Sequence, residues 1–82
     1  MNASGKTPED VVLGEYIFSD PGILGGDPIF RGTRVPVASL FEHLAGNCLL
    51  DEFLDNFPSV SRKAAVAVLA GAQKLALEKF RG

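Results

Sequence analysis

The eighteen residues from Asp20 to Val37, with the sequence DPGILGGDPIFRGTRVPV, constrain the fold of this chain more than any other segment. Glycine and proline recur throughout it, and these residues break or destabilise a regular helix. The segment is nevertheless too apolar for a solvated linker, because it carries six large aliphatic or aromatic side chains. The sequence therefore predicts a folded, turn-rich arm, with Arg31 and Arg34 on either side of a Gly-Thr turn.

Length and composition set limits on the rest of the chain. Eighty-two residues make one domain, and a domain this short buries only about 60% of its unfolded surface, which favours support from a partner or a second copy. The 46% hydrophobic and 22% charged content is typical of a globular protein. A single cysteine, Cys48, rules out a disulfide within the chain, and Met1–Thr7 lacks the charged-then-apolar order of a signal peptide. We therefore expect a cytoplasmic protein.

The charge is distributed unevenly along the chain. The net charge is −2, yet residues 35–60 contain four acidic and no basic side chains, and residues 61–82 contain five basic and one acidic. The overall pI of about 5.2 argues against a general nucleic-acid coat protein. The basic C-terminal third still leaves room for a local basic face.

The N-terminal part is predicted to form a tail and then an arm. We assign residues 1–14 to a tail, in which Thr7 could cap a short helix that ends at Gly14. Residues 15–82 form a single helical domain, with a β arm over residues 15–36. Two short strands are expected in the arm because β-favouring residues are bounded there by turn residues, and their ranges are Glu15–Ser19 and Ile29–Arg31.

From Pro36 onward the apolar spacing predicts three helices. The first runs from Pro36 to a stop at Gly46-Asn47, with Val37, Leu40, Phe41 and Leu44 on its apolar face and Ser39, Glu42 and His43 elsewhere. The second covers about Leu50–Phe57. The third covers about Arg62–Phe80 behind a Ser61 cap, with an apolar stripe of Ala65, Val68, Leu69, Ala72, Leu75 and Ala76.

Gly71 lies in the middle of the last predicted helix, where glycine costs roughly 1 kcal/mol relative to alanine. One interpretation is the close approach of another backbone, from the arm, another helix or a second subunit. The alternative is a tolerated surface glycine.

The second and third predicted helices also have the spacing of a helix-turn-helix unit, with the turn at Pro58–Ser61. Many helical bundles that never touch DNA share this spacing. It predicts a compact three-helix module and leaves nucleic-acid binding open.

Several of these segments together resemble a bacterial family known as domain of unknown function 433. The matching residues are Asp20-Pro21-Gly22, the string GGDPIFRGTRVPV over Gly25–Val37, the leucine-rich helix, Asn56-Phe57-Pro58 and the alanine-rich last helix. The resemblance covers about Tyr16–Leu77. Some members of the family are described as VapB-type antitoxins.

The resemblance implies a homeodomain-like three-helix fold behind a small β arm. It also implies an antitoxin role in some members, opposite a PIN-like ribonuclease, with DNA binding as a further property. Two positions depart from the family pattern. Asp27 stands where the family usually has lysine or another residue, and Leu49 stands where a serine or threonine cap is usual. The second helix is then left without a side-chain cap unless Asn47 supplies one.

The residues offer little for catalysis. His43, the single histidine, is expected on the solvated outer side of the first long helix, and Cys48 is expected to be a small buried hydrophobe. These two side chains do not make a zinc site. The glycine-rich arm lacks the Gly-Lys-Ser/Thr of a phosphate loop and the dinucleotide fingerprint. The sequence predicts no enzymatic activity, cofactor or metal.

Two binding functions stay open. In a DNA-binding version, Arg62 and Lys63 would enter the groove, and Ser61, Arg31 and Arg34 would contact phosphates. In a protein-binding version, the acidic helix would meet a basic partner. That acidic face comprises Asp51, Glu52 and Asp55. The plain alternatives are a solvated helix start for Arg62 and Lys63, salt bridges for the arm arginines, and an acidic face that only aids solubility.

We favour the protein-binding version. The expected function is that of an antitoxin-like protein, a homodimer, that neutralises a PIN-like nuclease, and operator-DNA binding for autoregulation stays open as a second property. The alternatives are a helix-turn-helix DNA-binding regulator without a toxin partner and a dimeric protein-interaction module.

Overall fold

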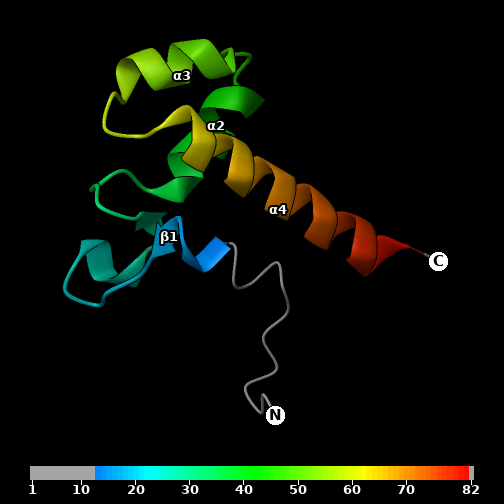
Figure 1. Cartoon of the computed structure of the whole chain (residues 1–82), viewed down its shortest axis with the longest axis horizontal. Helices are drawn as coiled ribbons and strands as arrows, with labels where there is room; N and C mark the ends of the chain where they lie inside the picture. The colour runs from blue at the N-terminus through cyan, green and yellow to red at the C-terminus, as the bar shows by residue number, and fades with distance from the viewer. Residues whose placement is uncertain (1–12, 82) are drawn as a thin grey trace.

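The computed structural model describes residues 13–81 and shows a mainly helical chain behind a small β arm (Figure 1). The arm contains strand β1 (Ile17–Phe18), the turn η1 (Leu24–Gly26) and strand β2 (Ile29–Phe30). Helices α2 (Val37–Ala45), α3 (Leu50–Asn56) and α4 (Arg62–Phe80) follow. This arrangement confirms the prediction of a small three-helix bundle with an N-terminal β arm. Within residues 13–81 no helix has both the length and the apolar character needed to cross a membrane.

The chain enters the described region at the end of a helical turn. Leu13 and Gly14 are helical, and a turn follows at Glu15 and Tyr16. The helix therefore ends at Gly14, as the sequence predicts. The predicted start of that helix at Thr7 lies outside the described residues.

The two strands pair antiparallel, with Ile17 opposite Phe30 and Phe18 opposite Ile29. They are shorter than predicted because the chain turns directly after Phe30. Gly32 has a φ of 82°, and the Thr33 N–H donates to the Phe30 carbonyl at 3.0 Å. A positive φ at the third position of a four-residue turn is typical of a type II turn, which explains the glycine at this position of the arm.

The tip of the arm is a left-handed turn. Leu24, Gly25 and Gly26 have φ values of 51°, 66° and 91°. A left-handed residue with a side chain costs roughly 1–2 kcal/mol, so the two glycines avoid a strain that Leu24 accepts. The Ser19 hydroxyl donates to the Gly26 carbonyl at 2.6 Å and closes the loop. The arm glycines therefore serve the turns of the chain, as predicted.

Helix α2 is rotated relative to its predicted face. Val37 and Leu40 are buried as expected, but Phe41 is 38% exposed. His43 is half-buried and turns towards α3, so the prediction of a solvated outer histidine is wrong. The helix ends at Ala45, and Asn47 just beyond it has a φ of 71°, with the Cys48 N–H donating to the His43 carbonyl at 2.9 Å. Asparagine rather than Gly46 therefore takes the left-handed position that terminates the helix.

The connection between α3 and α4 agrees closely with the sequence. Helix α3 ends one residue before the predicted Phe57. The Ser61 hydroxyl accepts a hydrogen bond from the Ala64 N–H at 3.0 Å, which is the predicted cap of α4. Val60 is buried in the turn and fixes it to the core.

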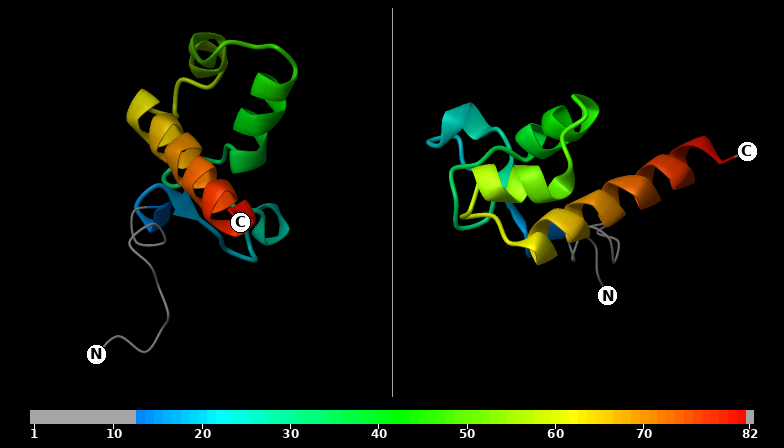
Figure 2. Two further views of the ribbon diagram at one scale, coloured as in Figure 1. Left: turned by 90° about the vertical axis from the view of Figure 1, so that its right-hand side faces the viewer. Right: turned by 90° about the horizontal axis from the view of Figure 1, so that it is seen from above.

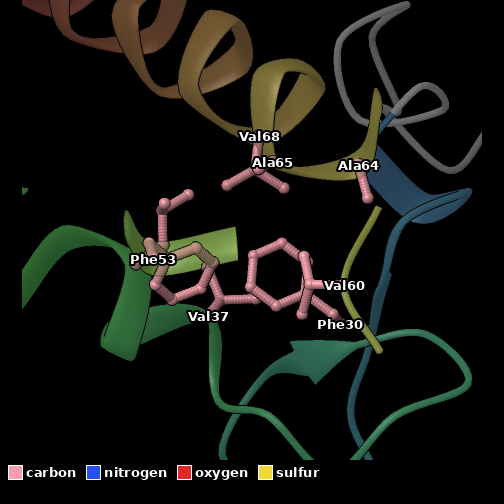
Figure 3. Packing of buried hydrophobic residues seen from close by; sticks show 8 residues of the cluster. Phe30, Val37, Phe53, Val60, Ala64, Ala65 and Val68 are labelled. Carbon is pink, nitrogen blue, oxygen red and sulfur yellow. The ribbon is translucent and has the colours of Figure 1, made fainter. Parts of the chain in front are cut away.

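The core is built by the arm and all three helices together. Its largest fully buried side chains are Phe30 of β2, Leu40 of α2 and Phe53 of α3. Figure 3 shows the Phe30 and Phe53 rings side by side beneath the start of α4, and their centroids are 6.3 Å apart. Since Phe30 comes from the arm, the arm is a structural part of the domain.

Only the first half of α4 belongs to this core. Ala65 and Val68 are buried, Leu69 and Ala72 are half-buried, and every described residue after Ala72 is exposed. Figures 1 and 2 show the C-terminal half of α4 extending away from the rest of the domain. The apolar stripe predicted along α4 continues to Leu75 and Ala76, and both residues are exposed in the structure.

The structure decides between the two interpretations of Gly71, because another group approaches this residue closely. A Cβ atom built on Gly71 would lie 2.6 Å from Cδ2 of Leu13, well inside van der Waals contact. The surface-glycine interpretation is wrong. The approaching group is a leucine side chain and not a second backbone, so Gly71 makes room for Leu13 against α4.

Candidate functional site

The outer side of α3 gathers the three predicted partner-binding carboxylates. Phe53 is buried and Leu50 and Leu54 are half-buried, which turns the opposite side of this short helix to solvent. That exposed side carries the acidic residues Asp51, Glu52 and Asp55. Throughout, we refer to these three residues as the acidic face.

Leu49 adds apolar surface at the start of the acidic face, which the sequence interpretation missed. It precedes α3 and is 68% exposed. Its position in the Leu49-Leu50 pair could have signalled this, because only one of two adjacent leucines at a helix start can face the core. A single exposed leucine is common on protein surfaces, so Leu49 adds apolar area beside the carboxylates without by itself marking an interface.

One carboxylate of the acidic face also caps its own helix. The Leu49 N–H donates to Oε1 of Glu52 at 2.7 Å, which is the half of a capping box that the third residue of a helix supplies. Asn47, the alternative cap that the sequence offered, instead ends α2. Glu52 therefore has a structural role as well as an exposed charge.

A second carboxylate pairs with a predicted DNA contact. The guanidinium of Arg62 donates to Oδ1 of Asp51 and ties the first turn of α4 to α3. Both side chains are largely exposed, so the pair contributes little to stability. Its consequence is electrostatic, because the charges of Asp51 and Arg62 largely cancel each other. Asp55 is then the acidic-face residue whose side chain has no hydrogen bond or ion pair within residues 13–81.

The two arm arginines differ from each other. Arg31 donates from Nη2 to the Gly14 carbonyl at 2.9 Å and to the Ile17 carbonyl at 3.3 Å. Its Cζ atom also lies 5.0 Å from the centre of the Phe18 ring. Arg31 therefore holds β1 against the turn after β2, whereas Arg34 is exposed and has no hydrogen bond or ion pair within residues 13–81.

The remaining predicted DNA contacts lie at the start of α4. The Ser61 hydroxyl oxygen accepts from the Ala64 N–H, which leaves its O–H able to donate to a phosphate. Lys63 is exposed and is free of hydrogen bonds and ion pairs to the described part of the chain. Among the predicted DNA contacts, Lys63 and Arg34 are therefore the two charged side chains that no other described residue pairs with, so their charges could bind phosphates.

His43 and Cys48 do not assemble a reactive centre. Nδ1 of His43 is 2.7 Å from the Ser39 carbonyl, and because that oxygen can only accept, Nδ1 carries the proton. The ring packs edge-on against Phe53 and Phe57, with centroid distances of 5.5 and 5.3 Å. His43 is thus a packing residue between α2 and α3. Across residues 13–81 no three histidine, cysteine or acidic side chains are grouped as a metal site would require.

The fold and its exposed surfaces define a small, mainly helical domain with a β arm. Residues 17–71 match a family described as "Protein of unknown function (DUF433)", and the chain belongs to this family. The resemblance noted in the sequence is thereby confirmed at the level of the family.

Two other proteins are similar to this chain, one in sequence and one in fold. It is 36% identical over 58 residues to the uncharacterized protein y4eO of Sinorhizobium fredii, a match that covers 71% of this chain and 26% of that protein. The chain thus spans about a quarter of that relative's length. A crystal structure of a DUF433 member from Anabaena variabilis shares the fold with a TM-score of 0.65, at 23% identity over 90% of this chain and 89% of that one.

Proposed function

We propose that this chain is an antitoxin-like protein that binds and neutralises a PIN-like ribonuclease toxin through the acidic face of α3. The observation that carries the proposal is the exposed acidic face next to the exposed Leu49. An apolar anchor bordered by charge of one sign suits a partner of the opposite sign. The resemblance to antitoxin-like members of the family supports the class of partner.

The charge distribution favours a basic protein partner. Residues 35–60 contain no basic side chain, and Arg62 neutralises only Asp51. A ribonuclease that grips RNA has to present basic groups to the phosphates. Opposite charges on two such surfaces raise the association rate, and this gain falls as salt screens the charges.

Charge reversal at Asp55 tests the proposal. Asp55→Lys changes an exposed residue whose side chain has no hydrogen bond or ion pair within residues 13–81, so the fold should be kept. Asp27→Lys makes the same change of charge at an exposed residue of the arm, between η1 and β2. The test first requires a PIN-like nuclease gene next to the gene for this chain; the two products are then co-expressed, and the complex is purified through a tag on the nuclease.

We expect the wild-type chain and Asp27→Lys to co-purify with the nuclease and Asp55→Lys to be lost. A loss of affinity of about tenfold or more corresponds to the removal of one well-placed charge contact plus the repulsion that replaces it. Equal recovery of all three chains would refute the acidic face as the contact surface. A chromosome with no nuclease gene beside this one would count against the partner class.

Operator DNA is the second candidate ligand. The order α3, turn, α4 and the available charges of Lys63 and Arg34 favour it. Opposing it, Asp51 and its neighbours would repel phosphates beside the same helix start. If DNA is bound, the chain shifts its own upstream DNA at low salt and Lys63→Glu weakens the shift. The lack of any shift at low salt would rule this function out.

A further inference from the structure

Strand β1 forms a free edge of the small sheet. Its neighbour β2 is flanked on both sides, since Ile29 pairs with Phe18 of β1 and also bridges to Pro36. Among residues 13–81 no strand pairs with the other side of β1. A free edge presents unpaired N–H and C=O groups, which are a template for pairing with another chain.

The polar backbone groups of this edge belong to Ile17. The Arg31 N–H donates to the Tyr16 carbonyl at 2.8 Å, so Arg31 and Tyr16 are a hydrogen-bonded pair. In an antiparallel ladder such pairs alternate with pairs that are not hydrogen-bonded, and the next pair, Ile17 and Phe30, is of the second kind. In agreement with this, the Phe30 N–H donates away from β1, to the Val35 carbonyl at 2.9 Å. The N–H and C=O of Ile17 therefore face away from β2, towards the free edge.

The side chain of Arg31 crosses β1 and binds this edge. Its guanidinium passes Phe18, with Cζ 5.0 Å from the ring centre, and Nη2 donates to the outward carbonyl of Ile17 at 3.3 Å. Nη2 and Nε also donate to the Gly14 carbonyl, at 2.9 and 3.2 Å. A planar guanidinium has several donors in a fixed arrangement and can bind two carbonyls at once. The acceptor that a second strand would need at Ile17 is therefore taken, and a positive charge lies beside it.

We propose that Arg31 closes the free edge of β1 and thereby prevents a second copy of this chain from pairing with it. Tyr16, Ile17 and Phe18 are three consecutive residues of high β propensity, which favours strand pairing wherever their backbone is accessible. Two copies joined through β1 would also bring two Arg31 guanidiniums together, and like charges repel. Charged side chains on edge strands are one way in which proteins avoid association of this kind. The inference concerns the arm alone and does not rest on the proposed function.

Removal of the Arg31 side chain tests this role. Arg31→Ala frees the Ile17 carbonyl, whereas Arg34→Ala removes the same charge from an exposed arm residue without a hydrogen bond or ion pair in the described region. Arg31→Ala also loses contacts within the arm and so lowers stability. Ser61→Ala, which removes the cap of α4, is the control for lowered stability with the edge intact. Sedimentation velocity at a series of concentrations measures the association of each purified chain.

We expect Arg31→Ala to form a species larger than the wild-type chain. It should do so at concentrations about tenfold or more below those at which the wild-type chain, Arg34→Ala or Ser61→Ala form a species of that size. Equal association of Arg31→Ala and Ser61→Ala would show that lowered stability is the cause. Sedimentation of Arg31→Ala that matches the wild-type chain would refute the blocking role.

Amide hydrogen exchange locates the contact on β1. The Ile17 N–H faces the edge and has no acceptor among the described residues, so it should exchange rapidly in the wild-type chain. In associated Arg31→Ala, pairing through β1 supplies an acceptor and should slow this exchange by about tenfold or more. An associated Arg31→Ala chain whose Ile17 N–H still exchanges rapidly would overturn the assignment of the contact to this edge.

Discussion

Replacing Gly71 by alanine sets two effects of opposite sign against each other. Alanine in mid-helix is favoured over glycine by about 1 kcal/mol. Against this, the new Cβ would lie 2.6 Å from Cδ2 of Leu13 and 3.0 Å from its Cδ1 and Cγ atoms. Real Cβ atoms almost never approach a neighbour within 3.0 Å, so the leucine has to move.

The size of the second effect follows from the burial of Leu13. Overpacking in a close-packed site costs about 1–3 kcal/mol. Leu13 is half-buried and can rotate, so we take about 1–2 kcal/mol for this site. Gly71→Ala should then change the free energy of unfolding by between zero and a loss of about 1 kcal/mol. With Leu13→Ala in place there is nothing to displace, and Gly71→Ala should stabilise the chain by about 1 kcal/mol.

A double-mutant cycle measures this coupling. Urea unfolding of the wild-type chain, the two single variants and the double variant is followed by circular dichroism, with an expected coupling energy of about 1–2 kcal/mol. The reversal of sign between the two backgrounds is the signature of the contact. A gain of about 1 kcal/mol from Gly71→Ala in both backgrounds would show that Leu13 does not pack on α4.

Three further predictions concern stability and are checked by the same unfolding assay. Ser61→Ala removes the cap of α4 and should destabilise the chain by about 1 kcal/mol, whereas Ser59→Ala, at an exposed position of the preceding turn, should have no measurable effect. Phe53→Ala leaves a cavity at the centre of the core and should cost about 3–5 kcal/mol, a large part of the free energy of unfolding of a chain of this size. The exposed pair of Asp51 and Arg62 should show a coupling energy below about 1 kcal/mol that falls further in high salt.

Where short-range rules govern the backbone, the sequence predicts the fold well. The Ser61 cap, the stop at Gly14 and the turn at Gly32-Thr33 each depend on a few adjacent residues, and all three are found in the structure. The three-helix order and the β arm follow for the same reason. Strand length was less predictable, because the turn at Gly32 cuts β2 short.

Side-chain environments were harder to predict because they depend on the partner element. The apolar spacing of α2 allowed Phe41 to face the core, yet the position of α3 favours His43 on that side, where Phe53 and Phe57 enclose its ring. In the same way, periodicity extended the apolar stripe of α4 to Leu75, since a pattern along one helix cannot tell where its neighbours end.

The candidate site was predicted only in part, because the contacts of its side chains also depend on neighbouring elements. Sequence position placed Asp51, Glu52 and Asp55 on one exposed side of α3, and the structure brings them together there. The sequence could not show that Arg62 pairs with Asp51 or that Arg31 binds carbonyls of the arm. Both contacts join segments that are separated in the sequence. They give Arg31 and Arg62 structural roles and leave Arg34 as the predicted arginine whose charge is free to bind a partner or phosphate.

The most direct test of the proposed function is RNA cleavage by the neighbouring PIN-like nuclease in the presence of this chain. The proposal predicts that wild-type chain and Asp27→Lys abolish cleavage at equimolar concentration and that Asp55→Lys leaves the nuclease active. Undiminished cleavage with excess wild-type chain would contradict the proposed function. Full inhibition by Asp55→Lys would contradict the role of the acidic face.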